Sequence, residues 1–305
     1  MKALKKHKDH ILYLLLICTM WSCERKEPFT HEELYTGTIP LSLDWQGATP
    51  THPTVQVHIQ GTHHPDIQRE ITKDTLFLLE ANGSAQLSLL EAEYIIAAWH
   101  DADNINFDGT SFRLTPDENG FLPEPGTLYA NYDKFQVTAQ QTTNVVHKLY
   151  PHTRTLSFDF KLEAQAKGRI KAIHATLSGI ASAKRITDRH VDEASSGSVA
   201  WILEQKTTTD TRTGQQEVKY FCKKRLLGIQ PNERQHFILT LNYTNGEQET
   251  IEKDLTSELH NFNETGEEKK DLNLSADIKF AGQADASVTI EDWKPGTDTD
   301  LDANN

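Results

Sequence analysis

Short stretches in which apolar and polar residues alternate constrain the fold of this chain more than any other feature. In the clearest of them, Leu156, Phe158, Phe160 and Leu162 occupy every second position. Because successive side chains of a β-strand point to opposite faces, this period of two predicts a strand with one buried face. The same alternation marks residues 41–45, 55–59, 85–89, 173–177, 237–243 and 272–278. The chain is therefore predicted to be all-β.

Turn-forming residues separate these stretches at intervals of strand length. Asn82-Gly83 and Asn245-Gly246 each stand between apolar runs, which is the sequence signature of a tight β-hairpin. Residues 94–99 fit a helix or a strand by periodicity alone, and we favour a strand because the stretch Asp101-Ala102-Asp103-Asn104 ends the run at strand length. Many short strands joined by turns are typical of antiparallel sandwiches.

The strand-like segments form two sets, separated by a weakly patterned region at residues 140–153. A single core rarely serves a chain of this length. We therefore predict two tandem antiparallel β-sandwich domains, residues 36–150 and 151–295. The last residues, 296–305, are acidic and polar, and we expect them to be a disordered tail.

The first 22 residues have the features of a secretory signal peptide. Four lysines precede the apolar run 11–17, which is too short to cross a bilayer, since that needs about 20 residues. The small residue Ser22 stands directly before Cys23. This arrangement resembles a bacterial lipobox, in which the cysteine is lipidated and becomes the first mature residue. We predict lipid attachment at Cys23 and a tether over residues 23–35.

Two alternatives remain open at this end of the chain. Cys18 is a second candidate for lipidation, although the bulky Ile17 precedes it. An ordinary signal peptide, with a buried cysteine near the cleavage point, also fits the pattern.

Acidic residues outnumber basic ones and limit the classes of partner. The net charge is −13 at pH 7, and the leader carries +3, so the chain after residue 22 has a net charge of −16. Such a chain binds nucleic acid and anionic headgroups poorly, so we predict no nucleic-acid partner and membrane attachment through the lipid. Cys222 is the only cysteine beyond Cys23, and we expect a buried apolar side chain there.

One segment resembles the start of a calcium-binding loop. Asn104, Asn106 and Asp108 alternate before Gly109, as oxygen ligands do in such loops. Thr115, however, stands at the twelfth position, where a bidentate glutamate is required. A plain turn is the favoured interpretation.

Histidines are densest at four positions near the start of the chain, His52, His58, His63 and His64. A zinc site needs three or four converging ligands, whereas adjacent side chains on an extended segment point apart. We expect loop histidines and no metal site.

The sequence contains no motif typical of catalysis or of nucleotide binding. Ser178-Gly179 and Ser195-Ser196-Gly197 lack the Gly-x-Ser-x-Gly elbow of hydrolases, and the Walker and Rossmann glycine patterns are absent. We expect a protein that is not an enzyme and binds no cofactor.

An ordered set of softer motifs resembles a known family. It comprises Cys23, residues 94–99 (YIIAAW), 175–181 (ATLSGIA), 226–229 (LLGI), 237–241 (FILTL) with Asn245-Gly246, 254–256 (DLT) and 288–293 (VTIEDW). In this order these motifs resemble the fimbrillin-like lipoproteins of Bacteroidota, especially the FimB/Mfa-type anchor subunits.

The resemblance implies two transthyretin-like domains and an outer-membrane, surface-located lipoprotein. It further implies a fimbrial anchor or accessory subunit acting in adhesion and biofilm formation, with fimbrial subunits as partners through strand exchange. Only Cys23 carries over as a functional position. The alternative is a surface carbohydrate-binding lipoprotein, which would need an exposed aromatic platform from Trp45, Trp99 or Trp201.

Overall fold

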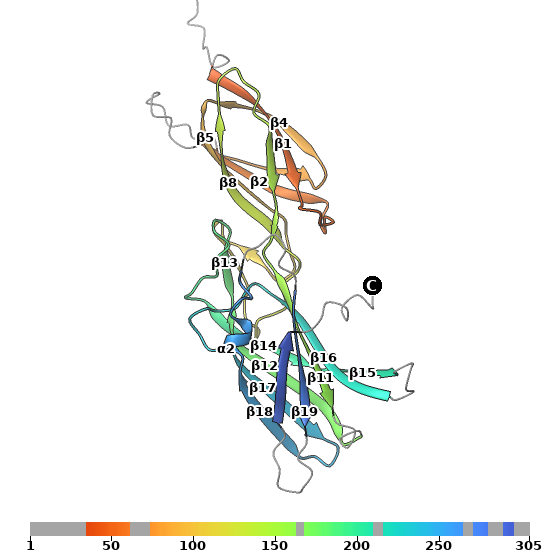
Figure 1. Cartoon of the computed structure of the whole chain (residues 1–305). Helices are drawn as coiled ribbons and strands as arrows, with labels where there is room; N and C mark the ends of the chain where they lie inside the picture. The colour runs from red at the N-terminus through yellow and green to blue at the C-terminus, as the bar shows by residue number, and fades with distance from the viewer. Residues whose placement is uncertain are drawn as a thin grey trace, which may run out of the picture.

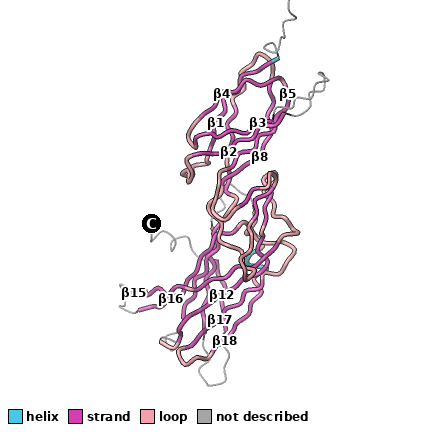
Figure 2. Tube along the Cα trace, turned by 180° about the vertical axis from the view of Figure 1, so that it is seen from behind, coloured by secondary structure: helices cyan, strands magenta, loops and turns pink. Residues whose placement is uncertain are grey.

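The computed structural model describes residues 35–61, 74–162, 168–209, 216–264, 271–279 and 289–295. Its strands form two lobes that lie end to end (Figure 1). Figure 2, viewed from behind, shows that the rest of the described chain is almost all loop, apart from short helical segments such as α2 (Thr256–Leu259). The prediction of an all-β fold with sandwich domains is confirmed.

The first lobe comprises residues 35–61, 74–99 and 129–151 and contains two sheets. One sheet has the order β4 (Ser84–Leu90), β1 (Thr36–Asp44), β9 (Val145–Lys148). The other has the order β10 (Tyr150–Pro151), β8 (Tyr129–Val137), β5 (Ala92–Trp99), β2 (Thr54–Gly61), β3 (Asp74–Glu80). The strand predicted at residues 94–99 is thus confirmed as part of β5.

The second lobe comprises the described residues from 154 onward and also contains two sheets. One has the order β15 (Glu204–Thr209), β16 (Gln216–Leu226), β11 (Arg154–Leu162), β19 (Leu272–Lys279), β20 (Thr289–Pro295). The other has the order β14 (Ser196–Ile202), β12 (Ile170–Ala181), β17 (His236–Tyr243), β18 (Gln248–Asp254).

Alternating residues build the two cores, as the sequence pattern predicts. Val55, Val57 and Ile59 of β2 are buried in the first lobe. Phe158 and Phe160 of β11 are fully buried in the second, and both stack near Phe237 of the opposite sheet. Fully burying a side chain of this size contributes about 1.5–3 kcal/mol to the free energy of unfolding. The buried side chains of these strands therefore account for much of the stability of each lobe.

Two strand pairs depart from the antiparallel arrangement that the sequence pattern indicates. β1 pairs with β9 in parallel, and β11 pairs with β19 in parallel. In each pair the partners are far apart in the sequence, so neither could be a hairpin.

The two Asn-Gly turns have different outcomes. Asn245-Gly246 joins β17 to β18 in an antiparallel hairpin, and Gly246 has a φ of 90°, so this prediction is confirmed. Asn82-Gly83 also forms a turn, but β3 pairs with β2 and β4 pairs with β1. The hairpin prediction is wrong here because the chain crosses from one sheet of the sandwich to the other.

A long connection between β5 and β8, residues 100–128, leaves the first lobe and packs on the second. We call it the docking loop. Its strands β6 (Asn106–Phe107) and β7 (Ser111–Arg113) form a small sheet with β13 (Ala183–Arg185) of the second lobe. Phe112, Leu114 and Leu122 of the docking loop are buried within the second lobe's hydrophobic cluster.

Leu122 fits a space that a glycine leaves open. A Cβ on Gly197 would lie 2.8 Å from Leu122 Cγ, closer than side chains normally approach. The N–H of Leu122 donates to the carbonyl of Ser198 over 2.8 Å, which fixes the loop at this point. The hydrophobic cluster of the second lobe therefore includes residues that precede position 150. The domain boundary that the sequence analysis places at residue 150 stays a prediction.

Replacing Leu122 with alanine should lower the free energy of unfolding by about 2–5 kcal/mol, because it leaves a cavity between the docking loop and the second sandwich. The measurement is urea unfolding followed by tryptophan fluorescence. Leu78→Ala is the matched control, since Leu78 is 67% exposed while Leu122 is 1% exposed. Equal effects of the two substitutions would contradict this account of the docking loop.

Candidate functional site at the lobe junction

A buried lysine lies where the docking loop meets the second lobe. Lys184 in β13 is only 6% exposed, and β13 pairs with β7 so that Lys184 lies opposite Phe112. Its Nζ donates a hydrogen bond of 2.9 Å to the carbonyl of His152, in the connection between the lobes. Among the described residues, no carboxylate forms an ion pair with this ammonium group.

Burial lowers the pKa of Lys184 from 10.5 to about 7, and the nearby charges of Arg154 and Arg189 act in the same direction. A charged ammonium group loses its hydration when it is buried, and like charges add repulsion. Lys184 can therefore gain or lose a proton near neutral pH.

His152 completes this buried group. It is fully buried, its ring packs edge-on against Phe112 at 5.2 Å, and within the described chain neither ring nitrogen has a hydrogen-bond partner. Burial lowers the pKa of His152 well below its usual range, Lys184 and Arg189 lower it further, and the backbone of Ala130 opposes them. The imidazole is therefore neutral at physiological pH.

Arg189 adds a further positive charge near Lys184 and His152. Its guanidinium lies 4.3 Å from the centre of the Tyr150 ring, a distance that suits a cation–π contact. Lys184, His152 and Arg189, which we call the basic group, thus join β13, the turn that follows it and the connection between the lobes. The basic group holds a proton-sensitive contact between Lys184 and the His152 carbonyl.

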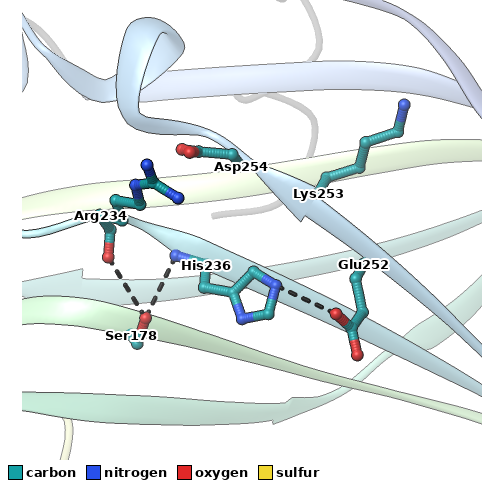
Figure 3. Close-up of a pocket in the computed structure, with 6 residues that line it drawn as sticks. All are labelled: Ser178, Arg234, His236, Glu252, Lys253 and Asp254. Carbon is teal, nitrogen blue, oxygen red and sulfur yellow. Dashed lines mark hydrogen bonds and ion pairs between the residues drawn. The ribbon is translucent and has the colours of Figure 1, made fainter.

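An open polar depression of about 550 Å³ lies on the second lobe (Figure 3). Its lining residues are Ser178, Arg234, His236, Glu252, Lys253 and Asp254. The His236 ring points toward Glu252, with Nε2 and Oε2 3.3 Å apart. Both side chains are exposed, so this ion pair adds little to stability.

Ser178 in this depression is engaged by backbone groups. Its hydroxyl accepts a hydrogen bond from the N–H of His236 at 3.1 Å and donates to the carbonyl of Arg234 at 3.4 Å. The next residue, Gly179, has a φ of 69° and lies in a bulge that lets β12 continue to Ala181. Ser178 is thus a strand residue beside a bulge, and no base is aligned with its hydroxyl in Figure 3.

Asp108 and Gly109 of the calcium-like segment lie in the turn between β6 and β7, as favoured from the sequence, whereas Asn106 lies in β6. The carboxylate of Asp108 accepts hydrogen bonds from the backbone N–H groups of Thr110 and Ser111 and from Arg113 Nε. Arg113 is the main cause that holds the pKa of Asp108 well below its usual range. The carboxylate is therefore occupied by protein donors.

The dense histidines do not converge where they are described. His52 stacks on His100 at 4.8 Å, whereas His58 pairs with Asp74. His63 and His64 lie outside the described residues. Within the described chain, no three side chains of the metal-binding types are grouped around one point.

The three tryptophans proposed for a carbohydrate platform are buried. Trp45, Trp99 and Trp201 are 6%, 8% and 6% exposed, in line with their place in the strand alternation. Cys222 is also buried, and burial strongly raises the pKa of its thiol, so it is the apolar core residue expected from the sequence.

The predicted lipid-attachment residue, Cys23, lies outside the described residues, as do the alternative Cys18 and the acidic tail. In the part of the chain that is described, no helix has the length and apolar character needed to cross a bilayer.

No family model and no curated protein matches this sequence. Solved structures do match. The fimbrial anchor protein Mfa2 from Porphyromonas gingivalis aligns with a TM-score of 0.52 at 14% identity, over 85% of this chain and 97% of that one. At this identity the similarity establishes a shared fold.

Two other structures, each described as a "putative adhesin", have the same fold. One, from Bacteroides ovatus, has a TM-score of 0.54 at 8% identity and covers 86% of this chain and 96% of its own. The other, from Bacteroides thetaiotaomicron, has a TM-score of 0.53 at 11% identity and covers 85% and 97%. The resemblance to fimbrillin-like proteins of Bacteroidota is therefore confirmed at the level of the fold.

Sequence reasoning missed the basic group at the junction. His152 falls in the weakly patterned region between the two strand sets, and nothing nearby marks it as buried. Lys184 did carry a signal, because it follows the small and apolar residues 180–183, which themselves predict burial.

Lys184→Met should stabilise the protein most at pH 7, and the gain should shrink as the pH rises toward 10.5. The pKa of Lys184 is lowered in the folded state, so between about 7 and 10.5 the unfolded chain binds the extra proton. Wild-type stability therefore rises with pH in this window, by up to about 1.4 kcal/mol per pH unit, and the variant lacks this term.

Urea unfolding at several pH values, with Lys223→Met as the control, tests this prediction. Lys223 is exposed on β16, so its replacement should leave the pH dependence unchanged. Parallel pH profiles for wild type and Lys184→Met would contradict the assignment of Lys184 as a buried ammonium group without an acidic partner.

Proposed function

We propose that this protein is an outer-membrane lipoprotein that serves as a fimbrial anchor or accessory subunit in adhesion and biofilm formation at the cell surface. The observation that carries the proposal is the end-to-end pair of sandwiches shared with Mfa2, over 97% of that protein's length. The basic leader and the Ser22-Cys23 pair give independent support from the sequence.

In this proposal, Cys23 carries the lipid and the tether is short. The first described strand, β1, begins at Thr36, 13 residues after Cys23. It starts at the end of the first lobe that is remote from the second lobe (Figure 1). A lipid at Cys23 would therefore leave the second lobe directed away from the membrane.

The proposed partners are fimbrial subunits, joined by strand exchange. A C-terminal strand is the natural donor in such an exchange, and β20 is the last described strand. β20 pairs with β19 and is the edge of its sheet, so donation would require β20 to leave β19. The proposal thus includes an opening of this edge during assembly.

We propose no enzymatic activity and no cofactor. Ser178 is engaged by backbone groups, Cys222 is buried, and Asp108 is saturated by protein donors. The carbohydrate-binding alternative receives no support from Trp45, Trp99 or Trp201, since all three lie in the cores. An assembly role is therefore the better proposal.

Cys23→Ala should abolish incorporation of radiolabelled palmitate and move the protein from the membrane fraction to the soluble fraction, because the acceptor thiol is lost. Cys18→Ala is the matched control and should change neither property. Palmitate labelling that persists in Cys23→Ala would overturn the lipid assignment.

The anchoring role itself is tested in cells that express either cysteine variant as the only copy. With Cys23→Ala, fimbriae should assemble but be shed into the medium, whereas Cys18→Ala cells should retain them. Immunoblots of fimbrial subunits in cell and medium fractions provide the readout. Equal retention by the two strains would contradict an anchor role.

A further inference from the structure

The first described strand, β1, is hydrogen-bonded near both of its ends to a segment that leads toward β11 of the second lobe. Residues 140–149 run parallel to β1, and we call them the clamp segment. Gln140 N–H donates to the Thr36 carbonyl at 2.8 Å, and Leu149 N–H donates to the Asp44 carbonyl at 2.8 Å. These two bonds mark the opposite ends of β1.

Further hydrogen bonds lie between these two ends. Thr38 donates to the Gln141 carbonyl and accepts from Thr143 N–H, each at 2.9 Å. From Leu41 to Asp44, β1 then pairs residue by residue with β9. The contact is thus parallel along β1, with one interruption at Pro40, which has no N–H to donate, between the Thr38 bridge and the pairing with β9.

The inward side chains of β1 strengthen this contact. Ile39 and Leu41 are buried in the first core, and Leu149 at the end of the clamp segment is fully buried. Sliding β1 along the clamp segment would draw these side chains out of the core while it breaks the ladder.

The direction of the two strands decides how they respond to tension. A pull from the N-terminal side acts on β1 at Thr36, and a pull from the second lobe acts on the clamp segment at Leu149. Because the strands are parallel, these points lie at opposite ends of the ladder, so tension shears all its bonds together. An antiparallel pair pulled from one end would open one bond at a time.

We infer that β1 and the clamp segment form a mechanical clamp, which bears tension passing between the N-terminal attachment and the second lobe. The inference rests on the proposed function, because the membrane anchor and a fimbrial partner supply the two ends of the load. The fold places the clamp on the covalent path between these ends, after the docking loop and before the chain enters β11 at Arg154.

The test compares two pulling directions in single-molecule force spectroscopy on the mature chain carrying Cys23→Ala. One version has attachment cysteines at Tyr35 and Pro151, which shear β1 against the clamp segment. The other has them at Tyr35 and Glu91. Glu91 N–H donates to the Tyr35 carbonyl, so this pair lies at one end of β1 and peels it from β4. Cys222 is buried and does not compete for attachment.

The rupture force in the shearing direction should exceed that in the peeling direction by about twofold or more, since forced unfolding reports the barrier along the pulled path. Circular dichroism first confirms that both versions are folded. Equal rupture forces would overturn the clamp. The attachment points replace the lipid, so this result is independent of whether Cys23 is lipidated.

A second comparison uses backbone chemistry at one rung of the ladder. Thr143→Pro removes the N–H that donates to Thr38, whereas Thr143→Ala keeps it. In the shearing direction, only Thr143→Pro should lower the rupture force. Equal forces for the proline and alanine variants would overturn the assignment of this bond to the clamp.

Discussion

Packing of the docking loop onto the second sandwich is the interaction on which the two-lobed arrangement depends. The covalent connection between the lobes is brief, since β10 ends at Pro151 and β11 begins at Arg154. The docking loop adds a second connection, in which Phe112 and Leu122 are buried in the other lobe's core. Burial of this kind resists separation of the lobes far better than a bare linker would.

The same junction contains buried titratable groups that cost stability. The side chain of Lys184 donates a hydrogen bond to the His152 carbonyl and has no acidic partner among the described residues, and the His152 ring beside it is neutral. Such groups reduce stability, yet they join β13, the docking loop and the connection between lobes through a few directional contacts. The junction therefore combines nonspecific apolar packing with contacts that fix one geometry, which suits a protein proposed to transmit tension from a membrane anchor.

The sequence pattern predicted the strands well, because a period of two has one physical cause wherever a sheet has one buried face. It predicted pairing less well. Leu79 and Leu89 both face the first core, whether their strands pair with one another or lie in opposite sheets, so the pattern around Asn82-Gly83 could not distinguish a hairpin from a crossing. Burial of Leu122 could not be predicted, because Pro116, Pro123 and Gly126 interrupt the apolar pattern around it. Burial of Lys184 could have been suspected from residues 180–183, but its approach to His152 could not, since the two residues are distant in sequence.

The most direct measurement of the central proposal is the set of proteins that co-purify with the native chain. The protein would be cross-linked on intact cells, extracted from outer membranes with detergent, purified through an affinity tag at the C-terminus, and analysed by mass spectrometry. The account predicts fimbrial subunits as the major partners, with cross-links to the second lobe, which lies far from β1. Recovery from the outer membrane without any fimbrial subunit, or cross-links confined to the first lobe, would contradict it.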